Sequence, residues 1–331
     1  MEINFSEVVP IVDASSVGEV RRKGMWAAER LGLDEVKAGE LALLATEVSR
    51  NVLLHGGGGE AIILGAKNDR GPMAGVLALD RGSGIQNIAT ALADGYSTAG
   101  TMGGGLGAMK RIASSLDIFT AGNGTIVFLE LGTAAQNDSL QIAGIALPYP
   151  KEKFCGDAWA YHRTPQRTLI LLVDGLGHGW EASEAAHEAV DVFHRHSQRS
   201  PREILGYMHD ALKKTRGAAA AISEIRPAEN RLTYAGVGNT VAVVLSNKVS
   251  RSLTSHNGTL GIAVPRIQEF QVEWPSRAIL IMHSDGVQTR WDLSSYPGLL
   301  SRHPAVIGGA LLRDFRRQRD DASVVVVKSD S

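Results

Sequence analysis

Four aspartates stand at the ends of apolar stretches in the C-terminal half of the chain. They are Asp157 in CGDAW, Asp174 in LILLVDGLG, Asp285 in AILIMHSDGV and Asp320 in RDDASVVVV. Short apolar runs of this kind are typical of buried strands, and a neighbouring glycine lets the chain turn sharply at the strand end. Any one of these aspartates alone is most simply a turn or cap residue. Together, however, the four predict a sheet with carboxylates gathered at one edge.

A carboxylate cluster with no matching set of histidines or cysteines indicates a particular class of metal. Hard oxygen ligands favour Mg²⁺ or Mn²⁺ over Zn²⁺. Two such ions can activate a water molecule and polarise a phosphoryl group for in-line attack. The C-terminal half is therefore a candidate for metal-dependent phosphoryl chemistry.

Length and charge exclude several other classes of protein. The chain has 331 residues, which is enough for about two domains, and a formal net charge of −1. We expect no nucleic acid and no membrane as a partner, because no basic excess and no long apolar run is present. The only cysteine, Cys155, excludes an intrachain disulfide and favours a reducing compartment. The first residues lack the pattern of a signal peptide, so we expect a soluble, cytoplasmic protein.

The order of periodic segments predicts an α+β protein of two domains, 1–135 and 138–331, joined by a polar linker over 133–139. In the first domain the pattern predicts helices over 15–31, 34–55 and 108–115 and strands over 61–66, 73–79, 116–120 and 124–131. In the second it predicts helices over 181–196 and 201–214, with strands over 141–150, 169–174, 218–227, 231–238, 240–246, 268–274, 278–285 and 322–328.

The second predicted helix carries a polar stripe. Glu47, Asn51 and His55 follow one another at spacings of four, which aligns them along one helix face. An asparagine oxygen suits hydrated Mg²⁺, and a glutamate one turn away can act as a general base. The alternative is an ordinary polar helix face in water.

Glycines and one aspartate form a second group in the N-terminal half. A strand ends at Asp80 in the sequence DRGSG, a later run GGGLG opens a short helix, and a threonine follows in NGTIVF. Glycines at a helix N-terminus present backbone N–H groups to phosphate. Taken singly, the first motif also fits a hairpin turn and the second a flexible linker. The residues concerned are Asp80, Gly82, Gly84, Gly103, Gly105, Gly107 and Thr125.

The order of these motifs resembles the GHKL (Bergerat) ATP-binding family, an α/β sandwich. The short stretch between Asp80 and Gly103 favours its small serine kinases and anti-sigma factors. The resemblance implies ATP as cofactor, Glu47 as base, Asn51 as a Mg²⁺ ligand and Asp80 as the adenine-binding carboxylate. It further implies that the remaining glycines and Thr125 line the nucleotide site.

The C-terminal motifs GDAW, DGLGHG, SDGV and DDAS resemble the type-2C-like phosphatases of the SpoIIE kind, which form an αββα sandwich. The resemblance implies that Asp157 and Asp174 bridge two Mg²⁺ or Mn²⁺ ions, with the Gly175 carbonyl binding one of them through water. Asp285 and Asp320 would complete the coordination, and Asp321 would support them. No phosphate-binding arginine is evident; Arg163 and Arg167 are unsupported candidates.

Together the two resemblances imply a bacterial partner-switching regulator. A metal-dependent phosphoserine/phosphothreonine protein phosphatase would be joined to a serine kinase-like domain, and both would act on a small antagonist protein of the STAS type. A sigma factor or another switch protein is a further candidate partner. One alternative is a phosphatase whose N-terminal half only binds nucleotide and a partner; another is a scaffold with decayed sites, which the intact aspartate set disfavours.

Overall fold

The computed structural model describes residues 3–68, 71–92, 105–132, 139–246 and 249–329. The chain forms two compact units, one of residues 1–136 with 292–313 and the other of residues 137–291 with 314–331. The stretch 292–313, although it lies between Asp285 and Asp320 in sequence, groups with the first unit.

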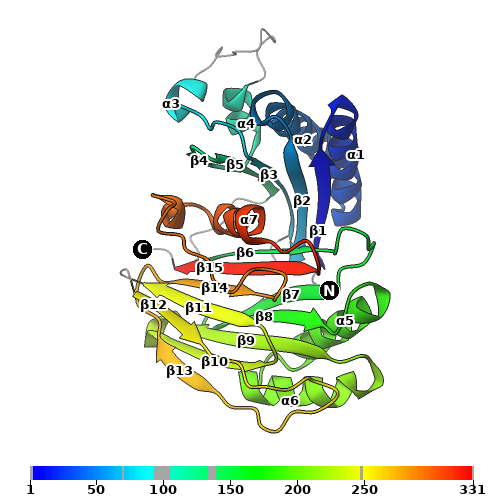
Figure 1. Cartoon of the computed structure of the whole chain (residues 1–331), viewed down its shortest axis with the longest axis vertical. Coiled ribbons are helices and arrows are strands. Elements are labelled where there is room, and N and C mark those ends of the chain that lie inside the picture. Colours follow the sequence, from blue (N-terminus) through cyan, green and yellow to red (C-terminus); the bar gives the residue numbers. More distant parts are fainter. Residues whose placement is uncertain (1–2, 69–70, 93–104, 133–138, 247–248, 330–331) are drawn as a thin grey trace. The chain divides into compact units, whose positions relative to one another are not determined.

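The first unit contains a five-stranded antiparallel sheet in the order β1-β2-β3-β5-β4 (Figure 1). Its strands are β1 (Ile3–Ile11), β2 (Gly59–Asn68), β3 (Gly71–Asp80), β4 (Ser115–Ala121) and β5 (Gly124–Gly132). The sequence pattern correctly predicted four of them. The edge strand β1 was missed, and it pairs with β2 along its whole length, from Ile3 opposite Lys67 to Ile11 opposite Gly59.

Two long helices, α1 (Ala14–Leu31) and α2 (Glu35–Gly56), cover one face of this sheet (Figure 1). Asp13 caps α1 by accepting the Ser16 N–H at 3.0 Å, and Asp34 caps α2 by accepting the Lys37 N–H at 2.8 Å. Their apolar faces join the sheet in one buried core. Two shorter helices, α3 (Ile88–Ala91) and α4 (Leu106–Ile112), complete the part before residue 136.

A helix that the sequence pattern did not predict, α7 (Pro304–Phe315), packs on the opposite face of the same sheet. It follows a short 3₁₀ turn, η3 (Leu299–Ser301). A Cβ placed on Gly309 would lie 3.1 Å from the side chains of Leu77 and Leu79, so the helix approaches β3 closely there. Every residue from Pro304 to Arg313 is buried, which explains the missing amphipathic pattern.

The second unit contains two five-stranded antiparallel sheets, β13-β10-β9-β8-β7 and β12-β11-β14-β15-β6 (Figure 1). The first sheet comprises β7 (Asp157–Arg163), β8 (Thr168–Gly175), β9 (Ala218–Arg226), β10 (Arg231–Val237) and β13 (Phe270–Glu273). The second comprises β6 (Leu140–Leu147), β11 (Val241–Ser246), β12 (Val249–Leu253), β14 (Ile279–His283) and β15 (Ala322–Ser329).

The two sheets face each other across an apolar core that includes Leu172, Tyr234, Leu280 and Val325. On the outer face of the first sheet lie α5 (Trp180–Arg195) and α6 (Pro201–Ala211). The short helices η1 (Leu212–Lys214) and η2 (Pro227–Glu229) flank β9. The continuous apolar run of β8 explains this arrangement, because successive side chains point to opposite faces of the sheet and both faces are buried. The prediction of a mixed α and β protein is confirmed.

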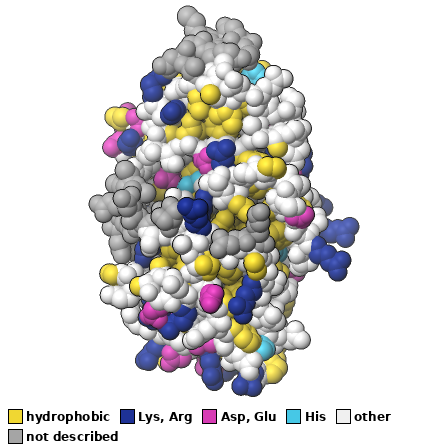
Figure 2. Space-filling model, turned by 90° about the vertical axis from the view of Figure 1, so that its left-hand side faces the viewer, with side chains coloured by type: hydrophobic (Ala, Val, Ile, Leu, Met, Phe, Trp, Pro, Cys, Tyr) yellow, Lys and Arg dark blue, Asp and Glu magenta, His cyan; other side chains and the backbone are white. Residues whose placement is uncertain are grey.

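Charged side chains of both signs are interspersed on the face that Figure 2 shows, in keeping with the net charge of −1. Among the described residues, no helix has both the length and the apolar character needed to cross a lipid bilayer.

Candidate functional site

Two of the sequence-predicted aspartates lie opposite each other in the second unit. Asp157 begins β7 and Asp174 stands near the end of β8, and the antiparallel register pairs the two residues directly. Beside them, the Gly175 N–H donates to the Gly156 carbonyl at 3.0 Å. A Cβ on Gly175 would collide with the Ala182 carbonyl, so only glycine fits there. Both carboxylates are thereby fixed at one edge of the sheet.

The other predicted aspartates act on this pair electrostatically. Burial raises the pKa of Asp157, and the charges of Asp321 and Asp320 raise it further. Burial likewise raises the pKa of Asp174, with added contributions from Asp157, Asp285 and Asp320. Such mutual effects require the carboxylates to lie near one another. Asp285 and Asp320 are therefore close enough to Asp174 for their charges to act on its pKa.

Asp320 and Asp321 differ in how their carboxylates are used. Asp321 is 2% exposed, and its two oxygens accept the N–H groups of Tyr149 at 2.7 Å and Gly156 at 2.9 Å. Asp320 is more exposed and accepts the Asp321 N–H at 2.9 Å. Asp321 thus holds the loop before β7 in place, which leaves Asp320 as the better candidate for binding an ion.

Asn239 contacts the candidate site, although it is not among the predicted site residues. It lies in the GVGN turn between β10 and β11, and its side-chain amide donates to Asp285 Oδ2 at 2.7 Å. The amide holds one oxygen of Asp285 in a fixed direction. The contact itself was not predicted, because the two residues are 46 positions apart in sequence.

The donor set suits a hard divalent cation. Asp157 Oδ2 is buried and has no hydrogen-bond partner among the described residues, so it is an acceptor without a donor in a cluster of carboxylates. A divalent cation would satisfy such an oxygen and offset the mutual repulsion. Within the described ranges, no three acidic, histidine or cysteine side chains converge closely enough, as they stand, to hold one ion together.

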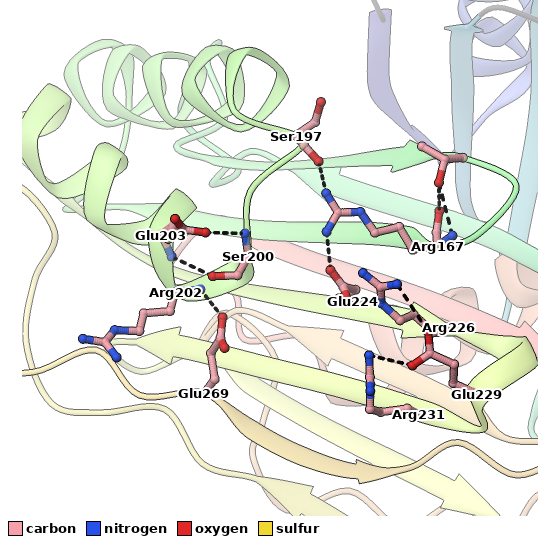
Figure 3. Close-up of polar contacts among 11 residues, drawn as sticks. Arg167, Ser197, Ser200, Arg202, Glu203, Glu224, Arg226, Glu229, Arg231 and Glu269 are labelled. Atoms are coloured by element: carbon pink, nitrogen blue, oxygen red, sulfur yellow. Dashed lines mark hydrogen bonds and ion pairs between the residues drawn. The ribbon is translucent and has the colours of Figure 1, made fainter.

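Neither arginine candidate for phosphate binding lies at this site. Arg167 precedes β8, at the strand end opposite to Asp174, about 20 Å away along the strand. Its guanidinium pairs with Glu224 at 2.5 Å and donates to the Ser197 carbonyl at 2.6 Å (Figure 3). Arg163 donates to the Leu140 carbonyl at 2.8 Å. Both side chains hold strands and loops of the fold together. Neither arginine is therefore a phosphate-binding residue of this site, and that suggestion from the sequence is wrong.

In the first unit, Asp80 organises the second group of predicted residues. It is buried at the end of β3, and its Oδ1 accepts the N–H groups of Gly82 at 2.9 Å and Thr125 at 3.0 Å. A Cβ on Gly84 would collide with the Ala121 carbonyl, and its φ of +79° favours glycine. Four predicted residues from two separate motifs thus meet around one carboxylate and the neighbouring turn.

The polar stripe of α2 is partly open to solvent, and the end of the glycine run lies at the start of α4. Glu47 and Asn51 are partly exposed on α2, and His55 is exposed near its C-terminal end. The same helix ends beside Asp80, because a Cβ on Gly56 would lie 2.5 Å from the Asp80 Cβ. Gly105 precedes the first turn of α4 and Gly107 is buried within it. Gly103 lies outside the described residues.

Two curated bacterial proteins are similar to parts of this chain. A stretch of 125 residues is 31% identical to the serine/threonine-protein kinase RsbT of Bacillus subtilis, covering 37% of this chain and 93% of RsbT. Another stretch is 24% identical over 154 residues to the phosphoserine phosphatase RsbX of the same organism, covering 46% of this chain and 77% of RsbX.

A solved structure of RsbX in complex with magnesium has a similar fold, with a TM-score of 0.53 and 19% identity over 65% of this chain and all of that chain. The C-terminal region thus has the fold of the type-2C-like phosphatases. The family described as stage II sporulation protein E (SpoIIE) matches residues 164–330. On that match, the chain belongs to the SpoIIE family.

Proposed function

We propose that the second unit is a metal-dependent phosphoserine/phosphothreonine protein phosphatase. The observation that carries this proposal is the register pairing of Asp157 with Asp174, beside the electrostatically linked Asp285 and Asp320. Membership of the SpoIIE family and similarity to the phosphoserine phosphatase RsbX support the same reaction class.

Mg²⁺ or Mn²⁺ would be held by Asp157 and Asp174, by the Gly175 carbonyl through water, and by Asp285 and Asp320. Bound there, the ions supply Lewis acidity and a water molecule acidic enough to attack phosphorus. The chain's own residues preorganise this chemistry. The β7–β8 register sets the spacing of the first pair, and Asn239 fixes the direction of Asp285.

Hydrolysis of p-nitrophenyl phosphate and of a phosphoserine peptide tests the proposal. We expect both reactions to require Mn²⁺ or Mg²⁺, to stop on chelation, and to be lost in Asp174→Asn. Asp210→Asn is a matched control, because Asp210 is an exposed carboxylate on α6 that pairs with Lys213. Metal-independent hydrolysis, or full activity of Asp174→Asn, would overturn the assignment.

We further propose that the first unit is a GHKL-type domain that binds ATP with Mg²⁺. Asn51 would bind the ion, Asp80 would accept the adenine amine, and Gly82, Gly84, Gly103, Gly105, Gly107 and Thr125 would line the nucleotide. The gathering of Gly82 and Thr125 on one oxygen of Asp80 supports this assignment, since it leaves the carboxylate in a fixed orientation. Similarity to the kinase RsbT favours phosphotransfer, with Glu47 as base.

The substrate of both units would be a small antagonist protein of the STAS type, with a sigma factor as a further candidate partner. A second candidate function keeps the phosphatase but makes the first unit a nucleotide-responsive binding module without catalysis. Incubation with labelled ATP and a candidate antagonist separates the two. Transfer that is lost in Glu47→Ala supports a kinase, whereas ATP binding without transfer to any antagonist supports the binding module.

A further inference from the structure

Exposed apolar side chains gather beside the candidate phosphatase site. Four of them, here called the apolar rim, come from three loops of the second unit and from the first residue of α5: Phe154, Leu176, Ile262 and Trp180. They are 45%, 50%, 61% and 62% exposed, respectively. A contiguous group of exposed apolar side chains on a soluble protein marks an interaction site more often than isolated ones do.

The loop of Phe154 and the start of α5 are joined by an aromatic contact. The ring centroids of Phe154 and Trp180 lie 4.9 Å apart with planes at 73°, in an edge-to-face contact. Behind them, His178 Nδ1 is 2.9 Å from Glu152 Oε1, and the ring of Tyr149 lies 5.1 Å from that of His178. The aromatic pair is therefore presented by a cross-linked platform and not by two independent side chains.

The third loop is tied to the same platform. The Leu176 N–H donates to the Gly217 carbonyl at 3.0 Å, and a Cβ on Gly217 would lie 3.3 Å from the Ile262 side chain. Leu260 is bridged to Ala218 by backbone hydrogen bonds in both directions. Leu176 and Ile262 thus sit on neighbouring loops whose spacing the backbone fixes.

Two residues of the apolar rim lie close in sequence to candidate ion ligands. Phe154 is three positions before Asp157, and Leu176 is two positions after Asp174. Adjacent Cα atoms are about 3.8 Å apart, so these separations are at most about 11 Å and 8 Å. An extended peptide advances about 3.3 Å per residue, so a substrate residue two to four positions from the phosphorylated one would lie over the rim.

Charge on the same loops suits a phosphorylated segment. Lys151 and Lys153 are exposed on the loop of Phe154, and Arg216 pairs with Glu181 next to Gly177. With Glu152, these loops carry three cations and two carboxylates around the acidic ion site. The cations attract a phosphate-bearing chain toward carboxylates that would otherwise repel it.

We propose that the apolar rim docks an extended segment of the phosphorylated protein substrate, taking an apolar side chain two to four residues from the phosphoserine or phosphothreonine. This inference rests on the proposed phosphatase function and adds to it a sequence preference of the substrate. It also assigns the two aromatic rings, which the fold does not bury, to substrate binding.

Binding of fluorescent phosphopeptides, followed by anisotropy, tests docking without requiring turnover. Two peptides differ only in having leucine or serine at the positions two to four residues from the phosphoserine. We expect the leucine peptide to bind at least about tenfold more tightly, which is the size expected for burying one apolar side chain. Equal affinity of the two peptides would overturn the proposal.

Variants of the rim locate the effect. Trp180→Ala at the start of α5 and Ile262→Ser on a loop should each abolish the preference for the leucine peptide. The matched control is Val249→Ser, because Val249 is 63% exposed on β12 and lies outside the rim. A preference that survives both rim variants would contradict the proposal. Hydrolysis of p-nitrophenyl phosphate by the wild type is measured in parallel. If hydrolysis is absent, the proposed phosphatase activity is contradicted, whereas the docking proposal is still judged by the difference in affinity between the two peptides.

Discussion

Asp157 on β7 and Asp174 on β8 stand directly opposite each other across an antiparallel strand pair. Burial and the neighbouring carboxylates raise the pKa of both residues, so their charged forms are unfavourable without a compensating cation. The fold thus places two repelling groups together in a position where a divalent ion would remove the repulsion.

Metal binding should therefore stabilise the protein. We expect millimolar Mn²⁺ or Mg²⁺ to raise the melting temperature of the second unit. At a hundredfold excess of metal over the dissociation constant, the free energy of unfolding should rise by about 3 kcal/mol. Asp157→Asn and Asp174→Asn should lose this effect and melt, without metal, no lower than the wild type. Differential scanning fluorimetry with and without chelator makes the comparison, and an undiminished shift in both variants would refute the site.

Neighbouring aspartates should respond differently to the same substitution. Asp320→Asn removes a proposed ion ligand and should lower activity by a factor on the order of 100 while leaving the metal-free melting temperature nearly constant. Asp321→Asn replaces one of two oxygens that accept backbone N–H groups, so the variant should lose about 1–3 kcal/mol of stability. Melting curves and steady-state rates of both variants provide the test. If Asp320→Asn instead lost stability and Asp321→Asn lost only activity, the roles of the two residues would be exchanged.

The sequence predicted the candidate sites through local patterns and missed what depends on distant contacts. Asp174 and Asp285 each end an apolar strand, and that pattern needs no tertiary information. Asn239 could not be found in this way, because its role arises from a turn that the sheet brings next to Asp285. The α7 helix was missed for a related reason. Since it is buried all round, its sequence lacks the alternation of polar and apolar faces on which helix prediction depends.

Asp80 should matter for nucleotide binding more than for folding. In Asp80→Asn the remaining oxygen can still accept the Gly82 and Thr125 N–H groups, whereas the new amide would face the adenine amine with a donor. We expect ATP affinity to fall at least about tenfold, with a small change in melting temperature. Isothermal titration calorimetry with ATP and Mg²⁺ measures this, and Asp34→Asn, which alters only the α2 cap, serves as the control. Unchanged affinity would remove Asp80 from the nucleotide site.

A buried glutamate in the first unit should make its stability depend on pH. Burial raises the pKa of Glu130 on β5 to about 7, from 4.5. Because the pKa is higher in the folded state, the stabilising contribution of the protonated form is full below about pH 4.5 and is lost as the pH rises through about 7. The loss amounts to at most about 3 kcal/mol. In Glu130→Gln this fall should be absent between pH 5 and pH 8, as urea unfolding at the two values would show; an equal fall in variant and wild type would contradict the assignment.

The start of α7 should depend on Asp117 of β4. Its Oδ2 accepts the His303 N–H at 2.6 Å, just before the first turn of the helix, and its Oδ1 lies 3.4 Å from the Arg302 guanidinium. The His303 ring stacks on Phe128, with centroids 4.4 Å apart and planes at 14°. A hydrogen bond to a charged group contributes about 1.5–3 kcal/mol, so Asp117→Ala should lower the unfolding free energy of the first unit by about that amount.

The Asp117 prediction can be separated from a general loss of surface charge. Glu19→Ala, an exposed carboxylate on α1, should leave the unfolding free energy nearly constant. Hydrogen exchange then locates the effect, because backbone amides in the first turn of α7 should exchange faster in Asp117→Ala while those of α1 keep their protection. If the loss of stability instead appears with equal strength across the whole first unit and α7 retains its protection, the carboxylate does not anchor the helix.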